Sequence, residues 1–365
     1  MPGVAVTRAL DRAALAVIRD LGRGGFRVIA CDRRIPPLGL HSRYCRAHLP
    51  LSGALPPGEL VERLVAARVD VLLAMTTPEV VRLSRMHATL ARRFALTFPD
   101  HETVLAAYDK RRTYRLCRRL GIPVPRLFSD GEGRGPVIVK PRFDIGGARG
   151  VRCYADIAQA RVEDGEKELV CEYIPGPPDA MHAATLLFDR NSRPVAWFTL
   201  QSLRQYPLTG GITAMAVSTC EPRLVETVLP FFETVRWRGP AEVEFKIDAR
   251  CGTPKVIEIN PRLPGYVRYF LDCGLHLPRL VAETAAGTVT RPTDYVVGRR
   301  MLNPGVFLKH CREILHAHGS RALSQAGREA WGARWRHPAD ITDPAPRLAK
   351  FLMWAGGVGG DGSPS

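Results

Sequence analysis

The alternation of strand-like and helix-like segments over the first hundred residues is the feature that most constrains the fold. Short apolar runs predict buried strands and amphipathic runs predict helices. The two kinds alternate in the order 4–6, 13–21, 26–31, 60–67, 69–75 and 78–90. Strands separated by helices pair in parallel, so this part of the chain is predicted to be α/β with a parallel sheet.

The turn after the first predicted strand argues against one class of nucleotide site. Dinucleotide-binding folds need a glycine-rich turn there, because glycine lets the backbone approach the pyrophosphate. This chain has Thr7, Arg8 and Ala9 at that position. We therefore expect no dinucleotide site.

Cysteine usage and hydropathy indicate a cytoplasmic protein. The nine cysteines are scattered without a CxxC pair, which predicts reduced thiols rather than a disulfide framework or a zinc site. No apolar run is long enough to cross a bilayer, and the start lacks a basic region followed by an apolar stretch. Neither a membrane span nor a signal peptide is expected.

The net charge of +16 has two interpretations. A polyanionic partner, such as nucleic acid or an acidic carrier protein, would suit it. However, only seven of the 52 basic residues are lysine, and the arginines are spread along the whole chain without a basic stripe interleaved with aromatics. This favours a compositional origin, and no nucleic acid partner is expected. In such a chain, a lysine at a motif position is informative.

A strand that ends in a lysine precedes a glycine-rich turn. Residues 136–141 form an apolar strand that carries Lys140, and Gly146, Gly147 and Gly150 follow. Glycines let backbone N–H groups approach phosphate oxygens, and a lysine adds a point charge, so the segment suits a nucleotide phosphate. A hairpin with a surface lysine explains the same residues equally well.

A second pattern places carboxylates on one face of a hairpin. From Glu242 to Asp248, polar residues alternate and share one face of a strand, and Glu258 and Asn260 share a face of the next strand. Two adjacent antiparallel strands would bring Glu244, Glu258 and Asn260 together. Such oxygen ligands suit Mg²⁺ bridging phosphates. The alternative is a solvated face of alternating charges.

These elements occur in an order that resembles the ATP-grasp superfamily, and within it the carboxylate–amine ligases similar to the large subunit of carbamoyl phosphate synthetase. The resemblance covers roughly residues 4–290 and includes the Asp109-Lys110 pair followed by Gly-Ile-Pro-Val-Pro at 121–125. It implies two parts. Residues 1–107 would form a parallel-sheet pre-ATP-grasp domain, and 108–290 an ATP-grasp domain with two α+β subdomains, including a lid at about 124–175. Beyond the resemblance, the residue pattern of 291–365 predicts a helical extension, with helices at 306–318 and 346–354 and a disordered tail.

The resemblance also implies roles for individual residues. Lys110 and Lys140 would bind phosphates, and Gly146, Gly147 and Gly150 would close over them. Glu172, Tyr173 and Ile174 would form the adenine hinge, with the Glu172 carbonyl and the Ile174 amide contacting the base. Glu244, Glu258 and Asn260 would hold the metal, and Arg262 would lie near the transferred phosphoryl group.

The chain departs from the family pattern at a few positions. Cys171 stands where many relatives have glutamate, and Arg149 is bulkier than the usual residue of the glycine loop. Pro178 occupies the place of the usual ribose-binding acid, so Asp179, one residue further on, is the candidate for that role. His182 has no evident partner and is expected to be structural.

The segment 201–212 resembles a region near the acyl substrate. Arg204 could hold a substrate carboxylate bidentately. A connecting loop with one salt bridge is the alternative.

The predicted function is an ATP-dependent ligase that uses Mg²⁺, with Mn²⁺ as a candidate substitute. A small-molecule carboxylate becomes an acyl phosphate, and an amine then forms an amide or peptide bond; Arg262, Lys140 and Arg204 are the expected catalytic residues. The same fold acylating a carrier-protein thiol or using bicarbonate stays open, as do a regulatory ATP sensor and, from the charge alone, a nucleic-acid-binding protein. A homodimer is also kept open.

Overall fold

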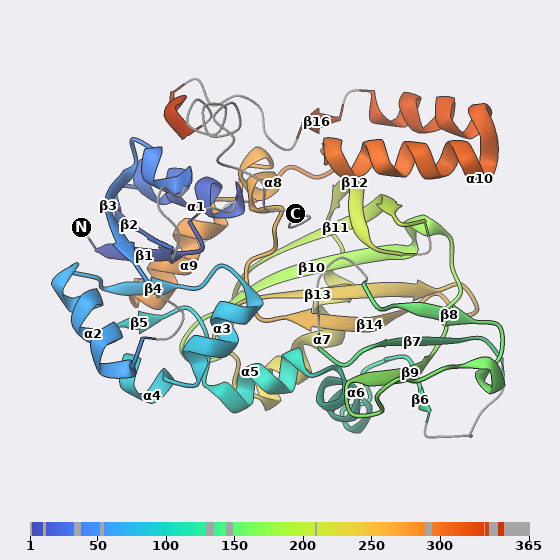
Figure 1. The fold of residues 1–365 in the computed structure, drawn as a ribbon, viewed down its shortest axis with the longest axis horizontal. Helices are drawn as coiled ribbons and strands as arrows, with labels where there is room; N and C mark the ends of the chain where they lie inside the picture. The colour runs from blue at the N-terminus through green and yellow to red at the C-terminus, as the bar shows by residue number, and fades with distance from the viewer. Residues whose placement is uncertain are drawn as a thin grey trace.

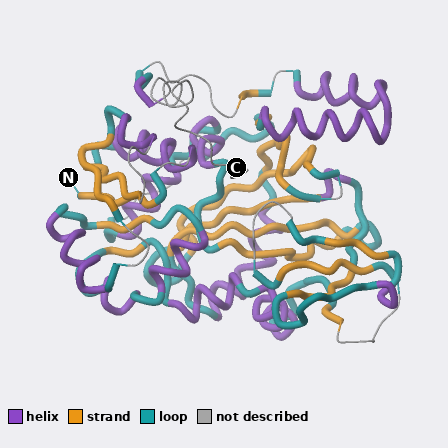
Figure 2. Tube along the Cα trace, viewed as in Figure 1, coloured by secondary structure: helices purple, strands orange, loops and turns teal. Residues whose placement is uncertain are grey.

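The computed structural model describes residues 2–9, 12–32, 38–51, 55–128, 135–143, 149–208, 210–288, 294–331, 333–335 and 342–346. Its strands form three sheets of five, four and seven strands (Figures 1 and 2). Of the described helices, none is long and apolar enough to cross a membrane.

The N-terminal part is the predicted parallel sheet, in the order β3-β2-β1-β4-β5. Its elements are β1 (Gly3–Thr7), α1 (Arg12–Arg23), β2 (Arg27–Asp32), η1 (Leu38–His41), β3 (Cys45–Pro50), α2 (Pro57–Ala66), β4 (Val71–Leu73), α3 (Thr77–Ser84), α4 (His87–Leu90) and β5 (Ala95–Leu96). Val4 and Val6 pack into one apolar cluster and Ala5 into another, so both faces of the sheet are covered.

Two predicted helices differ from the structure in detail. The segment 78–90 is two helices, α3 and α4, because the chain leaves helical geometry at Met86. The residue pattern also predicts one helix over 108–120, where the structure has α6 (Lys110–Arg119), separated from α5 (His101–Tyr108) by Asp109. The Asp109 side chain caps α6 by accepting from the Arg111 amide at 3.0 Å.

The four-stranded sheet, in the order β6-β9-β7-β8, lies within the segment expected to be the lid. It consists of β6 (Leu127–Phe128), β7 (Val137–Pro141), β8 (Arg152–Tyr154) and β9 (Glu168–Glu172), with η2 (Ile157–Gln159) between the last two. Its pairs are antiparallel.

The seven-stranded sheet, in the order β14-β13-β10-β11-β12-β15-β16, is the centre of the molecule (Figure 1). Its strands are β10 (Met181–Phe188), β11 (Pro194–Tyr206), β12 (Ile212–Thr219), β13 (Gly239–Asp248), β14 (Thr253–Asn260), β15 (Arg300–Leu302) and β16 (Arg334–Trp335). The helices in the same part of the chain are η3 (Pro178–Ala180), α7 (Pro222–Thr234), α8 (Val267–Asp272), α9 (Leu277–Ala285) and α10 (Pro304–Ala330). A cluster of buried aromatics joins α7 to this sheet, including Phe188, Phe232 and Trp237.

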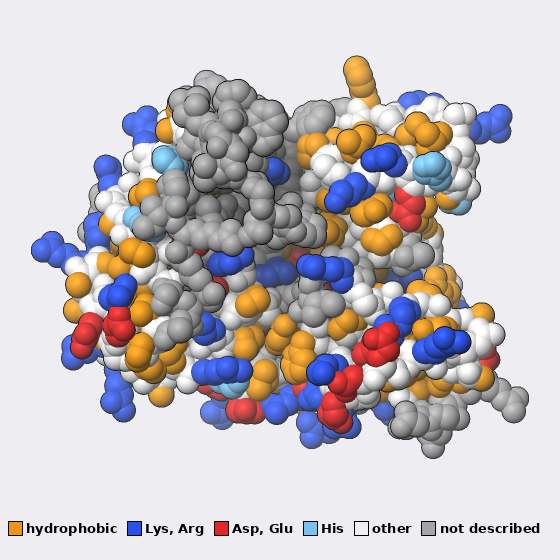
Figure 3. Space-filling model, in the orientation of Figure 1, with side chains coloured by type: hydrophobic (Ala, Val, Ile, Leu, Met, Phe, Trp, Pro, Cys, Tyr) orange, Lys and Arg blue, Asp and Glu red, His pale blue; other side chains and the backbone are white. Residues whose placement is uncertain are grey.

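The C-terminal part is not purely helical, because β15 and β16 extend the large sheet. The helix expected at 306–318 is contained in α10, which leaves helical geometry only at Gly319 (φ 75°). Most of the helix expected at 346–354, and the tail after it, lie outside the described residues. On the face shown in Figure 3, lysine and arginine side chains are scattered rather than gathered in one stripe.

Candidate active site

A cavity of about 720 Å³ is lined by residues of both the four-stranded and the seven-stranded sheet, together with Lys110 of α6. Side chains from β7 and β9 line one side of it, and side chains from β10–β14 line the other. A ligand in this cavity would therefore contact both sheets.

Lys110 and Glu258 form an ion pair at the cavity wall. Lys110 is the first residue of α6, and its Nζ lies 3.0 Å from Glu258 Oε2. Burial raises the pKa of Glu258, but the charges of Lys110 and Lys140 and a hydrogen bond from Asn260 outweigh it, so the pKa is lowered overall. Glu258 is thus an ionised carboxylate at neutral pH, held beside a lysine.

Lys140 is held by a residue that the sequence did not single out. Its Nζ donates to Tyr114 Oη at 2.7 Å and to the Ile257 carbonyl at 3.3 Å, and Tyr114 Oη itself donates to that carbonyl at 2.7 Å. Lys140 is only 8% exposed, and burial lowers its pKa. An anion in the cavity would restore the charge balance of this buried ammonium.

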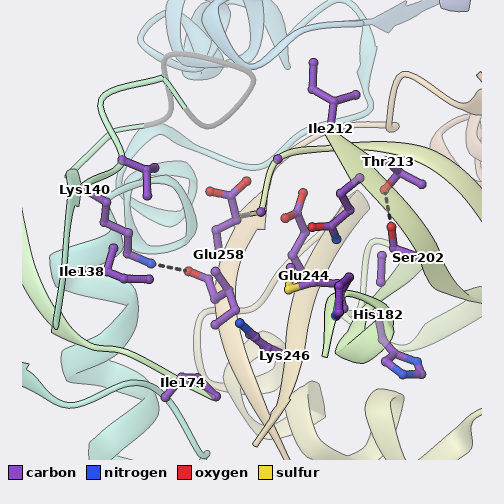
Figure 4. A pocket seen from close by; sticks show the side chains of 18 of the residues that line it. Ile138, Lys140, Ile174, His182, Ser202, Ile212, Thr213, Glu244, Lys246 and Glu258 are labelled. Carbon is purple, nitrogen blue, oxygen red and sulfur yellow. Dashed lines mark hydrogen bonds between the residues drawn. The ribbon is translucent and has the colours of Figure 1, made fainter. Parts of the chain in front are cut away.

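The β13–β14 register places the predicted metal ligands side by side. Glu244 lies opposite Glu258, and Glu242 lies opposite Asn260. Asn260 Nδ2 donates to Glu258 Oε1 at 3.2 Å. Figure 4 shows Glu244 and Glu258 projecting into the cavity near Lys140.

The donor chemistry of these residues fits a magnesium ion that also binds a nucleotide. Two carboxylates and one amide offer the oxygen ligands that Mg²⁺ prefers. Among the described residues there is no group of three or more His, Cys, Asp or Glu arranged to hold a metal on its own. A Mg²⁺ ion here would take its other ligands from phosphate oxygens and water, as this ion commonly does.

Arg262 is oriented by Glu242. Its Nη1 lies 3.0 Å from Glu242 Oε2, and both residues line the cavity. Glu242 is 4% exposed and also accepts from Asn260 Nδ2 at 3.4 Å. It lies on the predicted polar face of its strand but had no predicted role, although the alternation that indicated Glu244 also includes Glu242.

The expected adenine hinge borders the cavity. Cys171, Glu172, Tyr173 and Ile174 all line it. The Tyr173 ring faces Lys246, with Nζ 5.0 Å from the ring centroid, and burial lowers the pKa of that lysine. The expected hinge therefore borders the space that a ligand in the cavity would occupy.

The Glu172 side chain takes part in an ionic network next to the hinge. It pairs with Arg250 and, at 3.2 Å, with Lys255, and both cations also bind Asp248. This network joins β9 to the β13–β14 hairpin.

Several predicted site residues lie elsewhere. Gly146 and Gly147 are outside the described residues, whereas Gly150 (φ 72°) is described and follows Arg149, which lines the cavity. The Asp179 side chain is not among the cavity-lining groups, and its carbonyl accepts from Gln201 at 3.0 Å. Pro177 and Pro178 line the cavity instead, so the geometry gives no support to Asp179 as the ribose-binding acid.

Arg204 does not reach the cavity in this structure. Its Nη2 lies 2.5 Å from Glu329 Oε2 of α10, and its Nη1 donates to the Leu203 carbonyl. The ion pair agrees with the alternative interpretation, but Arg204 lies in the strand β11 and not in a connecting loop. By contrast, His182, expected to be structural, lines the cavity, and its buried Nδ1 has no partner among the described residues.

Comparison with known proteins assigns this arrangement to a class. A family model described as an ATP-grasp domain matches residues 107–266. No curated protein sequence matches the chain. Among solved structures, N5-carboxyaminoimidazole synthetase from Staphylococcus aureus in complex with ADP is similar at a TM-score of 0.66 and 13% identity, over 97% of this chain and 96% of that one.

Two further structures cover less of the chain. Biotin carboxylase from Campylobacter jejuni, in a β-γ-ATP complex, has a TM-score of 0.64 and 17% identity, over 82% of this chain and 74% of that one. L-amino acid ligase from Bacillus licheniformis has a TM-score of 0.60 and 18% identity, over 80% and 75%. At these sequence identities, the similarity shows a shared fold and nothing more specific.

The cavity lies between a small antiparallel sheet and a larger sheet, and the matched domain includes strands of both. Residues 107–266 match the ATP-grasp domain, and the chain as a whole has the fold of the similar solved structures. The finer similarity to carbamoyl phosphate synthetase stays a prediction.

Proposed function

We propose that this protein is an ATP- and magnesium-dependent ligase that activates a carboxylate as an acyl phosphate for attack by an amine. One observation carries the proposal: Lys110, Lys140, Glu244, Glu258 and Arg262 all line a single cavity between the two sheets. Cations and oxygen ligands gathered in this way suit a nucleotide triphosphate with its metal.

The residues divide the work of binding ATP. The hinge at 171–174 receives the adenine, and Lys110 and Lys140 bind the phosphates. Glu244, Glu258 and Asn260 hold the magnesium, which neutralises charge on the terminal phosphates when bound. The names of two similar structures include ATP or ADP, which supports a nucleotide in this cavity.

The reaction proceeds in two displacements. A carboxylate oxygen attacks the γ-phosphorus, the bond between that phosphorus and the β–γ bridging oxygen breaks, and ADP leaves. The amine nitrogen then attacks the acyl carbon, loses a proton and expels inorganic phosphate. Arg262 stabilises the charge on the transferred phosphoryl group, and Glu242 keeps its guanidinium in position.

Two variants of this proposal share its first step. A carrier-protein thiol in place of the amine, or bicarbonate in place of the acid, would use the same phosphate-binding residues. No described feature of the cavity favours either of them over an amine and an organic acid.

Identification of the nucleotide products tests the proposal. A matrix of acids and amines is incubated with ATP and Mg²⁺, and the products are separated by chromatography. We expect ADP and phosphate in equal amounts, released only with a suitable acid. Release of AMP and pyrophosphate would contradict the proposal, because the α-phosphorus would then be the atom attacked.

A further inference from the structure

One end of the cavity differs in chemistry from the rest. We call it the uncharged wall and define it as the cavity-lining residues of β11, β12 and β15, three of them apolar and three neutral polar, namely Leu200, Ile212 and Met301 with Ser202, Gln205 and Thr213. In Figure 4, Ile212, Ser202 and Thr213 lie on the other side of Glu244 from Lys140 and Ile138. The wall is therefore separated from Lys140 by the carboxylates.

The uncharged wall contains no ionisable side chain of these four types: of the described residues in β11, β12 and β15, none that lines the cavity is Lys, Arg, Asp or Glu. Leu200 and Met301 are buried, and the hydroxyls of Ser202 and Thr213 bind each other at 3.0 Å. The charged lining residues come from α6, β7, β9, β13, β14 and the loops next to them.

The one arginine of β11 is directed away from this wall. The β11–β12 pairing is irregular on both sides of Arg204, and its guanidinium pairs with Glu329 of α10. A substrate group at the wall therefore finds no cation there.

Helix α10 fixes this arrangement through two further contacts. His310 Nδ1 bonds the Gln205 carbonyl at 2.6 Å, and Glu313 Oε2 accepts from the Leu208 amide at 3.0 Å. Gln205 and Leu208 both line the cavity. The wall is thus held at several points by an element outside the matched ATP-grasp domain.

A charged group pressed against this wall would lose its hydration without gaining a counter-ion. Desolvation of an unpaired charge is costly, whereas burial of apolar surface is favourable. We infer that the acid activated by this protein is a monocarboxylic acid whose body, beyond the reacting carboxylate, is uncharged. The inference rests on the proposed function and names the substrate class of that site.

The test compares acids in matched pairs, with hydroxylamine in place of the amine. Hydroxylamine traps an acyl phosphate as a hydroxamate and releases phosphate. The pairs are hexanoate against adipate and 4-methylpentanoate against glutarate. Hydroxamate and ADP are measured together, and the binding of MgATP is measured by calorimetry.

We expect the apolar member of at least one pair to be used with a kcat/KM at least tenfold above that of its dicarboxylic partner. A preference for the dicarboxylic member, or ADP release with bicarbonate alone, would overturn the inference and leave ATP-dependent activation standing. If MgATP binds but no acid releases ADP, the proposed function and the inference both fail.

A substitution in the wall provides a second measurement. Ile212→Lys places a cation in the uncharged wall. It should raise the ratio of kcat/KM for the dicarboxylic acid to kcat/KM for the apolar acid at least tenfold. Leu308→Lys, on α10 at a position that is 64% exposed, is the matched control and should leave the ratio unchanged. An unchanged ratio in Ile212→Lys, with MgATP affinity intact, would contradict the inference.

Discussion

At the scale of single residues, Lys140 shows what a sequence can and cannot indicate. Lysine is rare in this chain, so a lysine beside a glycine-rich turn was informative. Its partners were not predictable, because Tyr114 comes from α6 and Ile257 from β14, and only the tertiary fold brings them together. The same holds for Arg204, whose partner in α10 could not be inferred from local pattern.

Removal of the Lys140 ammonium should weaken ATP binding. Lys140→Ala deletes a buried cation that lines the cavity, and charge-assisted contacts to phosphate are strong. We expect an at least tenfold rise in the Kd for MgATP by calorimetry, with the fold preserved in circular dichroism. Lys167→Ala, whose side chain is 82% exposed and pairs with Asp164, is the control. An affinity within twofold of the original protein would refute the assignment.

Glu242 offers a test of how Arg262 is positioned. Glu242→Ala removes the carboxylate that pairs with the guanidinium, whereas Glu242→Gln keeps a hydrogen-bond acceptor for it. If Arg262 binds the terminal phosphate, the alanine variant should bind a non-hydrolysable ATP analogue several-fold more weakly and ADP normally, and glutamine should restore part of the loss. Tighter binding of the analogue by both variants would show instead that Glu242 acts only as a repulsive charge.

At the scale of elements, the sequence predicted some of the helices and strands but missed the central strands β10, β11 and β12 and the pairing of distant segments. Alternation along 241–248 and 256–260 was sufficient for the β13–β14 hairpin, since its strands are adjacent in the chain. The pairing of β13 with β10, and of β9 with both β6 and β7, depends on packing between distant segments. The split between α3 and α4 was missed for a local reason, because an apolar helical pattern continues across it.

The ionic network between β9 and the hairpin should stabilise the protein in a pH-dependent way. A hydrogen bond from Arg250, with further bonds from its amide and from Lys255, holds the pKa of Asp248 well below its usual value. A carboxyl group with a depressed folded-state pKa contributes its stability above its unfolded pKa of about 4, and that contribution is lost as the pH falls.

Asp248→Asn should therefore lower the free energy of unfolding by about 1–2 kcal/mol at pH 7, a modest figure because Arg250 is half exposed. The difference from the original protein should shrink as the pH falls below about 4. Urea unfolding at pH 7 and at a pH below about 4 measures this difference in the free energy of unfolding. Asp164→Asn, in an exposed pair, should change little. A constant difference across this pH range would be inconsistent with the network.

At the scale of the whole molecule, the order of motifs was the strongest signal. It predicted the ATP-grasp domain that the family model matches over residues 107–266, and, together with the alternation of elements at the N-terminus, the combination of a parallel sheet with antiparallel pairing. The cavity itself and the contacts of α10 with residues that line it were not predicted, because both arise where several sheets and loops meet. The substrate class belongs to this level of structure, which explains why the motifs alone gave the chemistry of ATP but not the acid.

The attack of a carboxylate oxygen on the γ-phosphorus can be tested by following that oxygen. The acid is labelled with ¹⁸O in its carboxylate and incubated with ATP, Mg²⁺ and the amine, and the phosphorus-containing products are examined by mass spectrometry. We expect one ¹⁸O atom in the inorganic phosphate for each amide formed, because the amine breaks the acyl carbon–oxygen bond of the acyl phosphate. An ¹⁸O atom in AMP, or unlabelled phosphate accompanying amide formation, would contradict it.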